Sequence, residues 1–241
     1  RRQRQMCIRD RFQSQLDDFT EPLAETIKGF HNIRHRFGQW DAALARDAAG
    51  RRIHLAEEIG WIESRRAEML SFWSKVEDGT IPTRVTHNDT KINNILFDKQ
   101  GEVLCAIDLD TVMASTSLND FGDAIRSYAN TGDEDDRDLS RVGISLEMFS
   151  AYTDGYLSLR AAQLTDTEIG HLAFSARYIT FEQVLRFLMD YIDGDTYYKI
   201  KYPDHNLVRT HAQYRLLQSM EEHYGEMCRI VDGIAAKYRN A

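Results

Sequence analysis

The feature that most constrains this chain is Thr86–Asp110, which reads T-H-N-D-T-K-I-N-N-I-L-F-D-K-Q-G-E-V-L-C-A-I-D-L-D. Asn94–Phe97 predicts a short strand. Asp98–Gly101 predicts a turn, because glycine takes a positive φ at little steric cost. Val103–Ile107 predicts a second strand, and since it is apolar throughout we expect both of its faces to be covered. The stretch therefore predicts a hairpin whose two ends lie close together.

Polar side chains stand at both ends of this predicted hairpin. Asp89, Lys91 and Asn94 lie at the entry to the first strand, and Asp108 and Asp110 follow the second. A hairpin brings these carboxylates and the amide together on one small, rigid unit. Hard cations such as Mg²⁺ prefer oxygen ligands of this kind and keep some of their water. The pattern therefore suits a magnesium site.

The polar cluster resembles a kinase catalytic loop. Residues 87–94 (H-N-D-T-K-I-N-N) have the spacing of H-R-D-x-x-x-x-N, and residues 107–110 (I-D-L-D) stand where protein kinases carry D-F-G. With Asn88 in place of arginine, the chain is similar to the aminoglycoside phosphotransferase superfamily of small-molecule kinases. Two further blocks, residues 120–126 (D-F-G-D-A-I-R) and 185–198 (L-R-F-L-M-D-Y-I-D-G-D-T-Y-Y), resemble its N-acetylhexosamine 1-kinase group.

The resemblance runs from about Phe19 to the C-terminus and implies an ATP- and Mg²⁺-dependent enzyme. Its implied fold class is mainly α (α+β): the helical C-terminal lobe of a protein-kinase-like fold, with a small β-hairpin at the active site. The sequence has no G-x-G-x-x-G and no strand-rich region before residue 80. We therefore expect residues 12–241 to be that lobe without its β-rich N-terminal partner, inactive alone and a poor binder of ATP. Residues 1–11 are expected to be a non-native or disordered leader.

The resemblance also implies roles for the polar cluster. Asp89 would orient the attacking hydroxyl and partly deprotonate it, since phosphoryl transfer depends mainly on positioning and charge neutralisation; the alternative is a carboxylate that only caps a turn. Lys91 falls where many kinases hold the transferring phosphate, and the alternative is a solvated surface lysine. Asn94 and Asp108 would ligate Mg²⁺. Asp110 could bind a second metal, bind the substrate or order the loop.

One arginine interrupts an apolar stretch near the C-terminus. A buried arginine needs a carboxylate or a ligand oxygen as its partner. The resemblance implies that Arg186 and Tyr197 face a sugar pocket. The alternative is an ion pair between Arg186 and a nearby acid, such as Asp190 or Asp193.

Several other polar residues are expected to be structural. His87 is expected to pack beneath the metal-binding segment, as the equivalent histidine does in kinase loops. Asp120 and Asp123 stand at the start of a predicted helix, where carboxylates accept backbone N–H groups. The resemblance makes Asp123 a support for the catalytic loop. The acidic run Asp133–Asp138 is expected to be a solvated surface without a ligand.

Composition argues against other classes of protein. The formal net charge of −8 disfavours nucleic acid as a partner, because phosphate binding needs a basic face. The sequence has no apolar run of about 18 residues, so we expect no membrane span. Cys7, Cys105 and Cys228 form no disulfide framework or metal-ligand pattern, which favours a reducing, cytoplasmic location. His31 and His35 are spaced by one helical turn, but no neighbouring glutamate completes a zinc motif.

Apolar residues at steps of three and four predict a mostly helical chain around the hairpin. The first helix is expected to begin at Thr20–Pro22, because proline is tolerated in a first turn. Met113–Leu118 is expected to be a loop. The predicted helices cover residues 19–37, 40–49 (a helix or loop), 55–76, 119–128, 146–162, 166–191 and 207–238.

Three functions are consistent with the sequence. The first is transfer of the γ-phosphate of ATP to the anomeric hydroxyl of an N-acetylhexosamine. The second keeps this chemistry but uses another small alcohol, such as an aminoglycoside or a choline-like compound. The third is a non-catalytic, pseudokinase-like binding module. It is disfavoured because pseudokinases usually lose a catalytic carboxylate, and this chain keeps them all.

Overall fold

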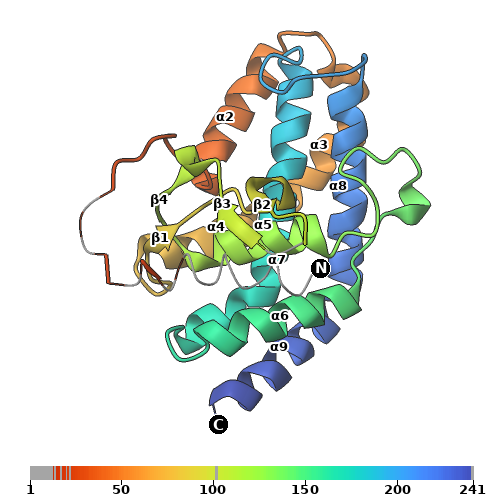
Figure 1. Cartoon of the computed structure of the whole chain (residues 1–241). Coiled ribbons are helices and arrows are strands. Elements are labelled where there is room, and N and C mark those ends of the chain that lie inside the picture. Colours follow the sequence, from red (N-terminus) through yellow and green to blue (C-terminus); the bar gives the residue numbers. More distant parts are fainter. Residues whose placement is uncertain are drawn as a thin grey trace.

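The structure is a computed structural model that describes residues 13, 15–16, 18–19, 21, 23–100 and 103–239. It is mainly helical with two small antiparallel sheets, as predicted (Figure 1). The predicted leader, residues 1–11, lies outside the described residues. Among the described helices, none is both long and apolar enough to cross a membrane. The α-helices are α2 (Ile33–Arg46), α3 (Ala56–Glu63), α4 (Arg66–Glu77), α5 (Ser117–Tyr128), α6 (Leu146–Arg160), α7 (Asp166–Ile192), α8 (His205–Glu222) and α9 (Tyr224–Arg239), and the 3₁₀ turns are η1 (Arg52–His54), η2 (Ile92–Asn94), η3 (Leu109–Thr111) and η4 (Leu139–Arg141).

The long helix α7 forms the centre of the core. Thr165 and Glu168 start it with a capping box, in which each side chain accepts the backbone N–H of the other residue. Most of α7 is buried because α2, α5, α8 and α9 pack against it. Gly122 lets α5 approach closely, since a Cβ at this position would lie 2.3 Å from the carbonyl oxygen of Ser175. The close approach fixes α5, which carries polar residues to the site.

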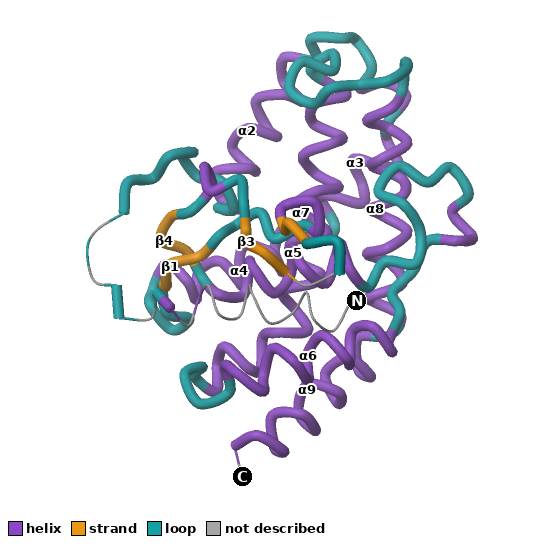
Figure 2. The backbone as a smooth tube through the Cα atoms, viewed as in Figure 1, coloured by secondary structure: helices purple, strands orange, loops and turns teal. Residues whose placement is uncertain are grey.

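The helices surround α7 in two groups (Figures 1 and 2). The first group, α2, α3 and α8, lies beside one part of α7, while α6 and α9 pack on each other toward its other end. The two sheets lie to one side of this helical body, where β1 contacts α5. The loop between β1 and β2 therefore lies against the helical body, where it contacts α5.

Each sheet is one pair of antiparallel strands. β1 (Arg84–Thr86) pairs with β4 (Met113–Ser115), and β2 (Ile95–Phe97) pairs with β3 (Val103–Ala106). The β2–β3 hairpin is the one that the sequence predicts. The β1–β4 pair contradicts the loop predicted for Met113–Leu118, because strands of three residues carry too little alternation to be recognised.

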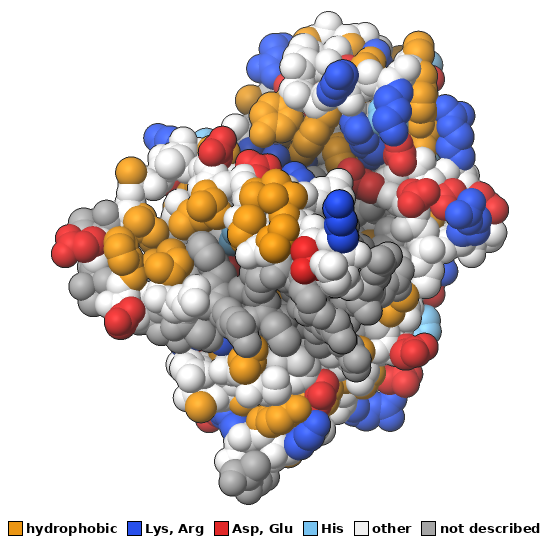
Figure 3. Space-filling view, in the orientation of Figure 1, with side chains coloured by type: hydrophobic (Ala, Val, Ile, Leu, Met, Phe, Trp, Pro, Cys, Tyr) orange, Lys and Arg blue, Asp and Glu red, His pale blue; other side chains and the backbone are white. Residues whose placement is uncertain are grey.

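The outer face of the hairpin is exposed. Leu104 is 61% exposed, Leu96 is 44% exposed, and Cys105 is exposed as well. Figure 3 shows hydrophobic side chains gathered on this side of the molecule, in the region of the two sheets. The expectation that Val103–Ile107 is covered on both faces is therefore wrong for the described part of the chain. The apolar composition of a strand can be read from its sequence, but its burial depends on what packs against it.

Helix α2 begins later than predicted. Asn32 caps it, and its side-chain oxygen accepts the backbone N–H of His35 at 3.0 Å. Gly29, with a φ of 63°, turns the chain just before this cap. The helix then continues without a break from Ile33 to Arg46, so the separate elements predicted over 19–37 and 40–49 are wrong.

Two predicted long helices are each divided in two. Between α3 and α4, the Ser64 hydroxyl bonds the carbonyl oxygen of Trp61 at 3.1 Å. Between α8 and α9, Nδ1 of His223 lies 2.8 Å from the carbonyl oxygen of Ser219. Such side-chain bonds compete with the helical backbone pattern at a boundary. The helices predicted over 146–162 and 166–191 agree with α6 and α7 to within two residues.

Candidate active site

Hydrogen bonds to α5 hold the loop that follows β1. The backbone N–H groups of His87 and Asn88 donate to the carboxylate of Asp120, at 3.1 and 2.7 Å. The Thr90 hydroxyl donates to the carbonyl oxygen of Asp120 at 2.8 Å. Asn88 is left-handed, with a φ of 63°, which asparagine tolerates better than most residues. Helix α5 therefore fixes the backbone on both sides of Asp89.

These contacts correct the expectation for the start of α5. The helix is capped by Thr116, whose side chain accepts the N–H of Leu118. Asp120 accepts from the loop after β1 instead of from its own helix. Asp123 accepts from Arg126 at 2.9 Å. Both carboxylates thus have structural partners, as predicted, but the N–H groups that Asp120 accepts come from the loop after β1 and not from the helix start.

Turn η3 holds the same loop from another direction. The Thr111 hydroxyl donates to the carbonyl oxygen of His87 at 2.7 Å, and the Asn88 amide donates to the carbonyl oxygen of Thr111 at 3.0 Å. Nε2 of His87 lies 3.2 Å from the carbonyl oxygen of Ile107. His87 therefore packs beneath the segment that carries Asp108, the position that the resemblance implies.

The predicted catalytic residues meet at Asp89. Its Oδ2 accepts from Nζ of Lys91 at 2.7 Å and from Nδ2 of Asn94 at 2.8 Å. Because the amide nitrogen of Asn94 is used in this bond, its oxygen Oδ1 is the atom that can ligate a cation. The Lys91 side chain is 41% exposed, so its ion pair with Asp89 is a solvated one that a competing anion can exchange.

Asp108 lies two residues after the end of β3, close to the loop that carries Asp89. The backbone N–H of Ile107 donates to the carbonyl oxygen of Asn94 at 3.0 Å, which joins the two ends of the hairpin. A cavity of about 420 Å³ opens beside them. Four of the predicted polar residues line it: Asp89, Lys91, Asp108 and Asp110.

The Asp108 carboxylate lines this cavity, and Asn94 bonds Asp89, which also lines it. Their side-chain oxygens are of the kind that a hard divalent cation prefers. Within the described residues, no group of three or more His, Cys, Asp or Glu side chains could hold a metal ion by itself. Mg²⁺ usually takes one or two protein carboxylates and completes its shell with phosphate oxygens and water. The Asp108 carboxylate and Oδ1 of Asn94 fit that requirement, so the donor set suits a metal–nucleotide complex better than a bare ion.

Another wall of the same cavity comes from α7 and the segment after it. Arg186, Tyr197 and Tyr198 all line the cavity. The guanidinium carbon of Arg186 lies 5.8 and 5.6 Å from the ring centres of Tyr197 and Tyr198, and its Nη1 lies 4.0 Å from Glu182. Burial raises the pKa of Tyr198 to about 12, so its hydroxyl is protonated at neutral pH. Tyr197 is 68% exposed and reaches solvent.

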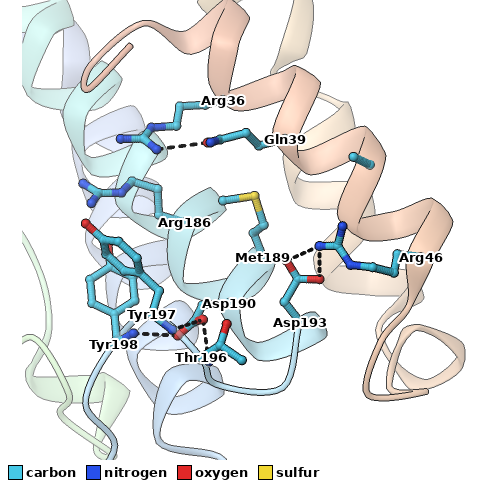
Figure 4. A pocket seen from close by; sticks show the side chains of 11 residues that line it. Arg36, Gln39, Arg46, Arg186, Met189, Asp190, Asp193, Thr196, Tyr197 and Tyr198 are labelled. Atoms are coloured by element: carbon cyan, nitrogen blue, oxygen red, sulfur yellow. Dashed lines mark hydrogen bonds and ion pairs between the residues drawn. The ribbon is translucent and has the colours of Figure 1, made fainter. Parts of the chain in front are cut away.

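The two acids considered as alternative partners of Arg186 bind other groups. Asp190 accepts the backbone N–H groups of residues 196–198, at 2.9, 2.8 and 3.0 Å. Asp193 accepts from Arg46 at 2.6 Å. Figure 4 shows both acids turned toward these partners. Neither acid is therefore the partner of Arg186, and the nearby acid that pairs with it is Glu182, four residues earlier on α7. Asp190 instead holds the backbone of the segment that carries Tyr197.

A second cavity, of about 360 Å³, adjoins the first (Figure 4). Arg186, Tyr197 and Tyr198 line both cavities. Across the second cavity, α2 contributes Arg36, whose Nη1 donates to the side-chain oxygen of Gln39 at 3.0 Å. The space beside Arg186 therefore extends toward α2.

The acidic run at 133–138 is only partly a solvated surface. Glu134 lines the first cavity and accepts from Arg126 at 2.8 Å. Asp135 lies 2.8 Å from Nε2 of His205. The expectation that the whole run is solvated is therefore wrong, since these acids tie the segment to α5 and α8.

Two buried residues at the site were not predicted from the sequence. Nδ1 of His31 lies 2.7 Å from Glu182, and Nε2 lies 2.7 Å from the carbonyl oxygen of Asn88. One signal was available for Glu182: it precedes Arg186 by four residues in an apolar helix, the spacing of an ion pair. His31 carried no comparable local signal.

Comparison with known protein families agrees with this geometry. The model of the phosphotransferase enzyme family matches residues 8–161, which is 154 of the 241 residues. The matched span contains the catalytic loop, the hairpin and α5. It ends before α7, so Arg186 and Tyr197 lie outside it. The match therefore bears on the chemistry of the loop more directly than on the identity of the acceptor.

Proposed function

We propose, from the premise that this chain belongs to the phosphotransferase enzyme family, that it transfers the γ-phosphate of ATP to a hydroxyl group of a small sugar. The acceptor we propose is an N-acetylhexosamine, phosphorylated at its anomeric hydroxyl. The observation that carries the proposal is the meeting of Lys91 and Asn94 at one carboxylate oxygen of Asp89, in the cavity that Asp108 also lines.

In this proposal Asp89 acts on the acceptor. Its carboxylate accepts a hydrogen bond from the acceptor hydroxyl and takes the proton as the new O–P bond forms, while the bond from the γ-phosphorus to the β,γ-bridging oxygen breaks and ADP leaves. Asn94 keeps that carboxylate in place, because its Nδ2 donates both to Oδ2 and to the backbone carbonyl oxygen of Asp89, at 2.8 and 3.0 Å. Positioning of this kind supplies much of the rate acceleration in phosphoryl transfer.

Asn94 and Asp108 would hold Mg²⁺ together with the nucleotide phosphates. The bound ion supplies charge neutralisation at the transferring phosphoryl group. Lys91 adds to it. When the nucleotide arrives, the exposed Lys91 ammonium leaves Asp89 for a phosphate oxygen, and this frees Asp89 to accept from the hydroxyl.

Arg186 and Tyr197 would bind the acceptor. A guanidinium donates to hydroxyl and carbonyl oxygens, and an aromatic ring packs on the apolar face of a sugar. The cavity of about 420 Å³ has the size of a small-molecule site. Both residues share it with Asp89, so an acceptor held by them lies within reach of the catalytic carboxylate.

An acceptor screen tests the proposal. The full-length enzyme is incubated with ATP, Mg²⁺ and one acceptor at a time, and ³¹P NMR identifies the products. The acceptors are N-acetylglucosamine, N-acetylgalactosamine, glucose, an aminoglycoside and choline. We expect a sugar 1-phosphate from an N-acetylhexosamine. Transfer only to the aminoglycoside or to choline would overturn the proposed acceptor, and ATP binding without transfer to any of them would favour a binding module.

A further inference from the structure

His31 is a buried imidazole with a hydrogen-bond acceptor at each of its two ring nitrogens. Nδ1 lies 2.7 Å from Oε2 of Glu182, and Nε2 lies 2.7 Å from the carbonyl oxygen of Asn88. A backbone carbonyl cannot donate a proton. A neutral imidazole carries one N–H and can satisfy only one such partner unless the other supplies a proton. The geometry therefore requires either an imidazolium or a protonated Glu182.

The surroundings of Glu182 decide between these two states. Oε1 of the same carboxylate lies 3.3 Å from Nε of Arg36, on α2, and 4.0 Å from Nη1 of Arg186, on α7. Burial raises the pKa of Glu182, but the cations around it outweigh that effect and lower it. A carboxylate beside two guanidinium groups is ionised at neutral pH. The shared proton therefore belongs to His31.

The charges that face His31 come from several elements. Glu182 and Arg186 face it from α7, Arg36 lies beside Glu182 from α2, and Asp89 lines the same cavity. Burial lowers the pKa of His31, but the Glu182 charge and hydrogen bond outweigh this and raise it above 6.5. The His31 side chain therefore keeps its proton to a higher pH than a free imidazole does.

Through Glu182, His31 connects Arg186, on the proposed acceptor side of the cavity, to the loop that carries Asp89. Glu182 binds His31, Arg36 and Arg186, and Arg186 lines both cavities. On its other side, His31 holds the carbonyl oxygen of Asn88, the residue directly before Asp89. One chain of contacts therefore runs from the proposed acceptor-binding arginine to the backbone beside the proposed catalytic carboxylate.

We infer that His31 is a positioning residue, which as an imidazolium clamps the Asn88 carbonyl and holds Asp89 in line with an acceptor bound at Arg186. This inference rests on the proposed function for its kinetic consequence. Loss of the proton leaves one ring nitrogen with a lone pair in place of its N–H. If the remaining N–H keeps its hydrogen bond to Glu182, the lone pair faces the carbonyl oxygen of Asn88. Asn88, the left-handed residue before Asp89, then loses this hydrogen bond.

The sign of the pH dependence follows from the raised pKa. The folded state binds the His31 proton more tightly than the unfolded state, so this contribution to stability is fully present below pH 6.5. It is lost as the pH rises through the folded-state pKa of His31. Turnover is expected to fall as the pH rises through that same pKa, because the hydrogen bond that holds the loop is lost together with the proton.

Histidine-detected ¹⁵N–¹H NMR on the unliganded protein is the first test. At pH 7 we expect both ring nitrogens of His31 to show the shifts of protonated nitrogens. The backbone amide signals of residues 88 and 89 should titrate with the same midpoint. A neutral tautomer at pH 7, or loop signals that do not follow the His31 midpoint, would overturn the inference. Since this measurement uses no substrate, its outcome is independent of the proposed reaction.

Kinetics of the full-length enzyme give the second test. His31→Gln keeps a donor of similar reach but no charge, and we expect kcat to fall about 10- to 100-fold, with a smaller change in KM for ATP. The alkaline fall in kcat should disappear in this variant. His35→Gln is the matched control: a nearby half-buried histidine on α2, expected to leave both the kcat and its pH profile unchanged.

The pH profile separates positioning from support of the fold alone. A purely structural histidine would lower the melting temperature of His31→Gln and leave the pH profile per folded molecule as in the wild type, which would contradict the inference. If the variant does not fold, the NMR titration of the wild type decides. If no acceptor is phosphorylated by the wild type, the proposed function fails while the titration still tests the His31 clamp.

Discussion

The two small sheets of this protein differ in what surrounds them. The loop that follows β1, the first strand of the β1–β4 pair, is buried and polar: His87, Asn88 and Thr90 are almost inaccessible, and each bonds a group from α5 or η3. The β2–β3 hairpin is the opposite, apolar and open, with Leu104 61% exposed. Within the candidate site, the apolar segment is therefore exposed and the polar segment is buried.

The difference shows how the site is kept rigid. A loop with buried backbone groups must give each of them a hydrogen-bond partner, and Asp120 supplies partners for two consecutive N–H groups. Those bonds fix the loop around Asp89. The hairpin contributes through its ends, at Asn94 and Asp108, while the side chains on its outer face make few contacts. Substitutions in the two regions should therefore have very different effects.

The largest effect is expected at the reacting group. Asp89→Asn removes the proton acceptor but keeps the shape of the side chain, so kcat should fall by about 10²- to 10⁴-fold with acceptor and ATP binding largely kept. Steady-state kinetics with an identified acceptor measure this. Asp232→Asn, an exposed change on α9, is the control and should have no effect. Near-normal turnover of Asp89→Asn would remove its catalytic role.

The next effect concerns the base of the loop. Asp120→Asn replaces one carboxylate oxygen by an amide nitrogen that faces N–H donors, and the free energy of unfolding should fall by about 2–4 kcal/mol. Urea denaturation measures the loss. Asp98→Asn in the hairpin turn keeps the oxygen that bonds the N–H of Gln100, and should cost less than about 0.5 kcal/mol. An equal loss of unfolding free energy at the two positions would contradict the contrast between the buried loop and the open hairpin.

A smaller effect on turnover is expected at Arg186, on the proposed acceptor side of the cavity. Arg186→Lys keeps the charge but loses the planar, multiple donors, so KM for the acceptor should rise about tenfold with a lesser change in kcat. Arg229→Lys, on the exposed side of α9, is the control. An unchanged acceptor KM in Arg186→Lys would mean that the acceptor binds elsewhere.

The smallest effect is expected on the open face of the hairpin. Leu104→Ala should change the free energy of unfolding by no more than about 0.5 kcal/mol, because the side chain is already in water. The same deletion at the fully buried Leu118 should cost about 2–5 kcal/mol. A large loss of unfolding free energy in Leu104→Ala would show that this face is covered in solution. The contrast in burial between the two sheets would then be wrong.

The hairpin and the order of the site residues could be predicted because their signals are local. A turn between two apolar segments predicts paired strands, and the polar residues at their ends follow from that pairing. The long amphipathic helices α6 and α7 were predicted for the same reason. In contrast, the β1–β4 pair joins strands of three residues that are far apart in sequence, and neither strand carries a periodic signal of its own.

The unpredicted part of the site depends on tertiary contacts. His31 and Glu182 meet across 151 positions of sequence, and nothing near either residue indicates the other. Asp120 was assigned to its own helix because a carboxylate in a first turn usually serves there. Its actual partners, the N–H groups of His87 and Asn88, become available only when α5 packs beneath the loop. Local patterns therefore predicted which polar residues meet around Asp89, whereas the fold determines which residues hold them in place.

The central claim is that the two ends of one hairpin hold a divalent ion beside Asp89. Crystals of the full-length enzyme grown with Mn²⁺ and a non-hydrolysable ATP analogue test it directly by anomalous scattering. The account predicts one anomalous peak within about 2.0–2.3 Å of both Oδ1 of Asn94 and a carboxylate oxygen of Asp108. A peak bound to the nucleotide but out of reach of both side chains would contradict it.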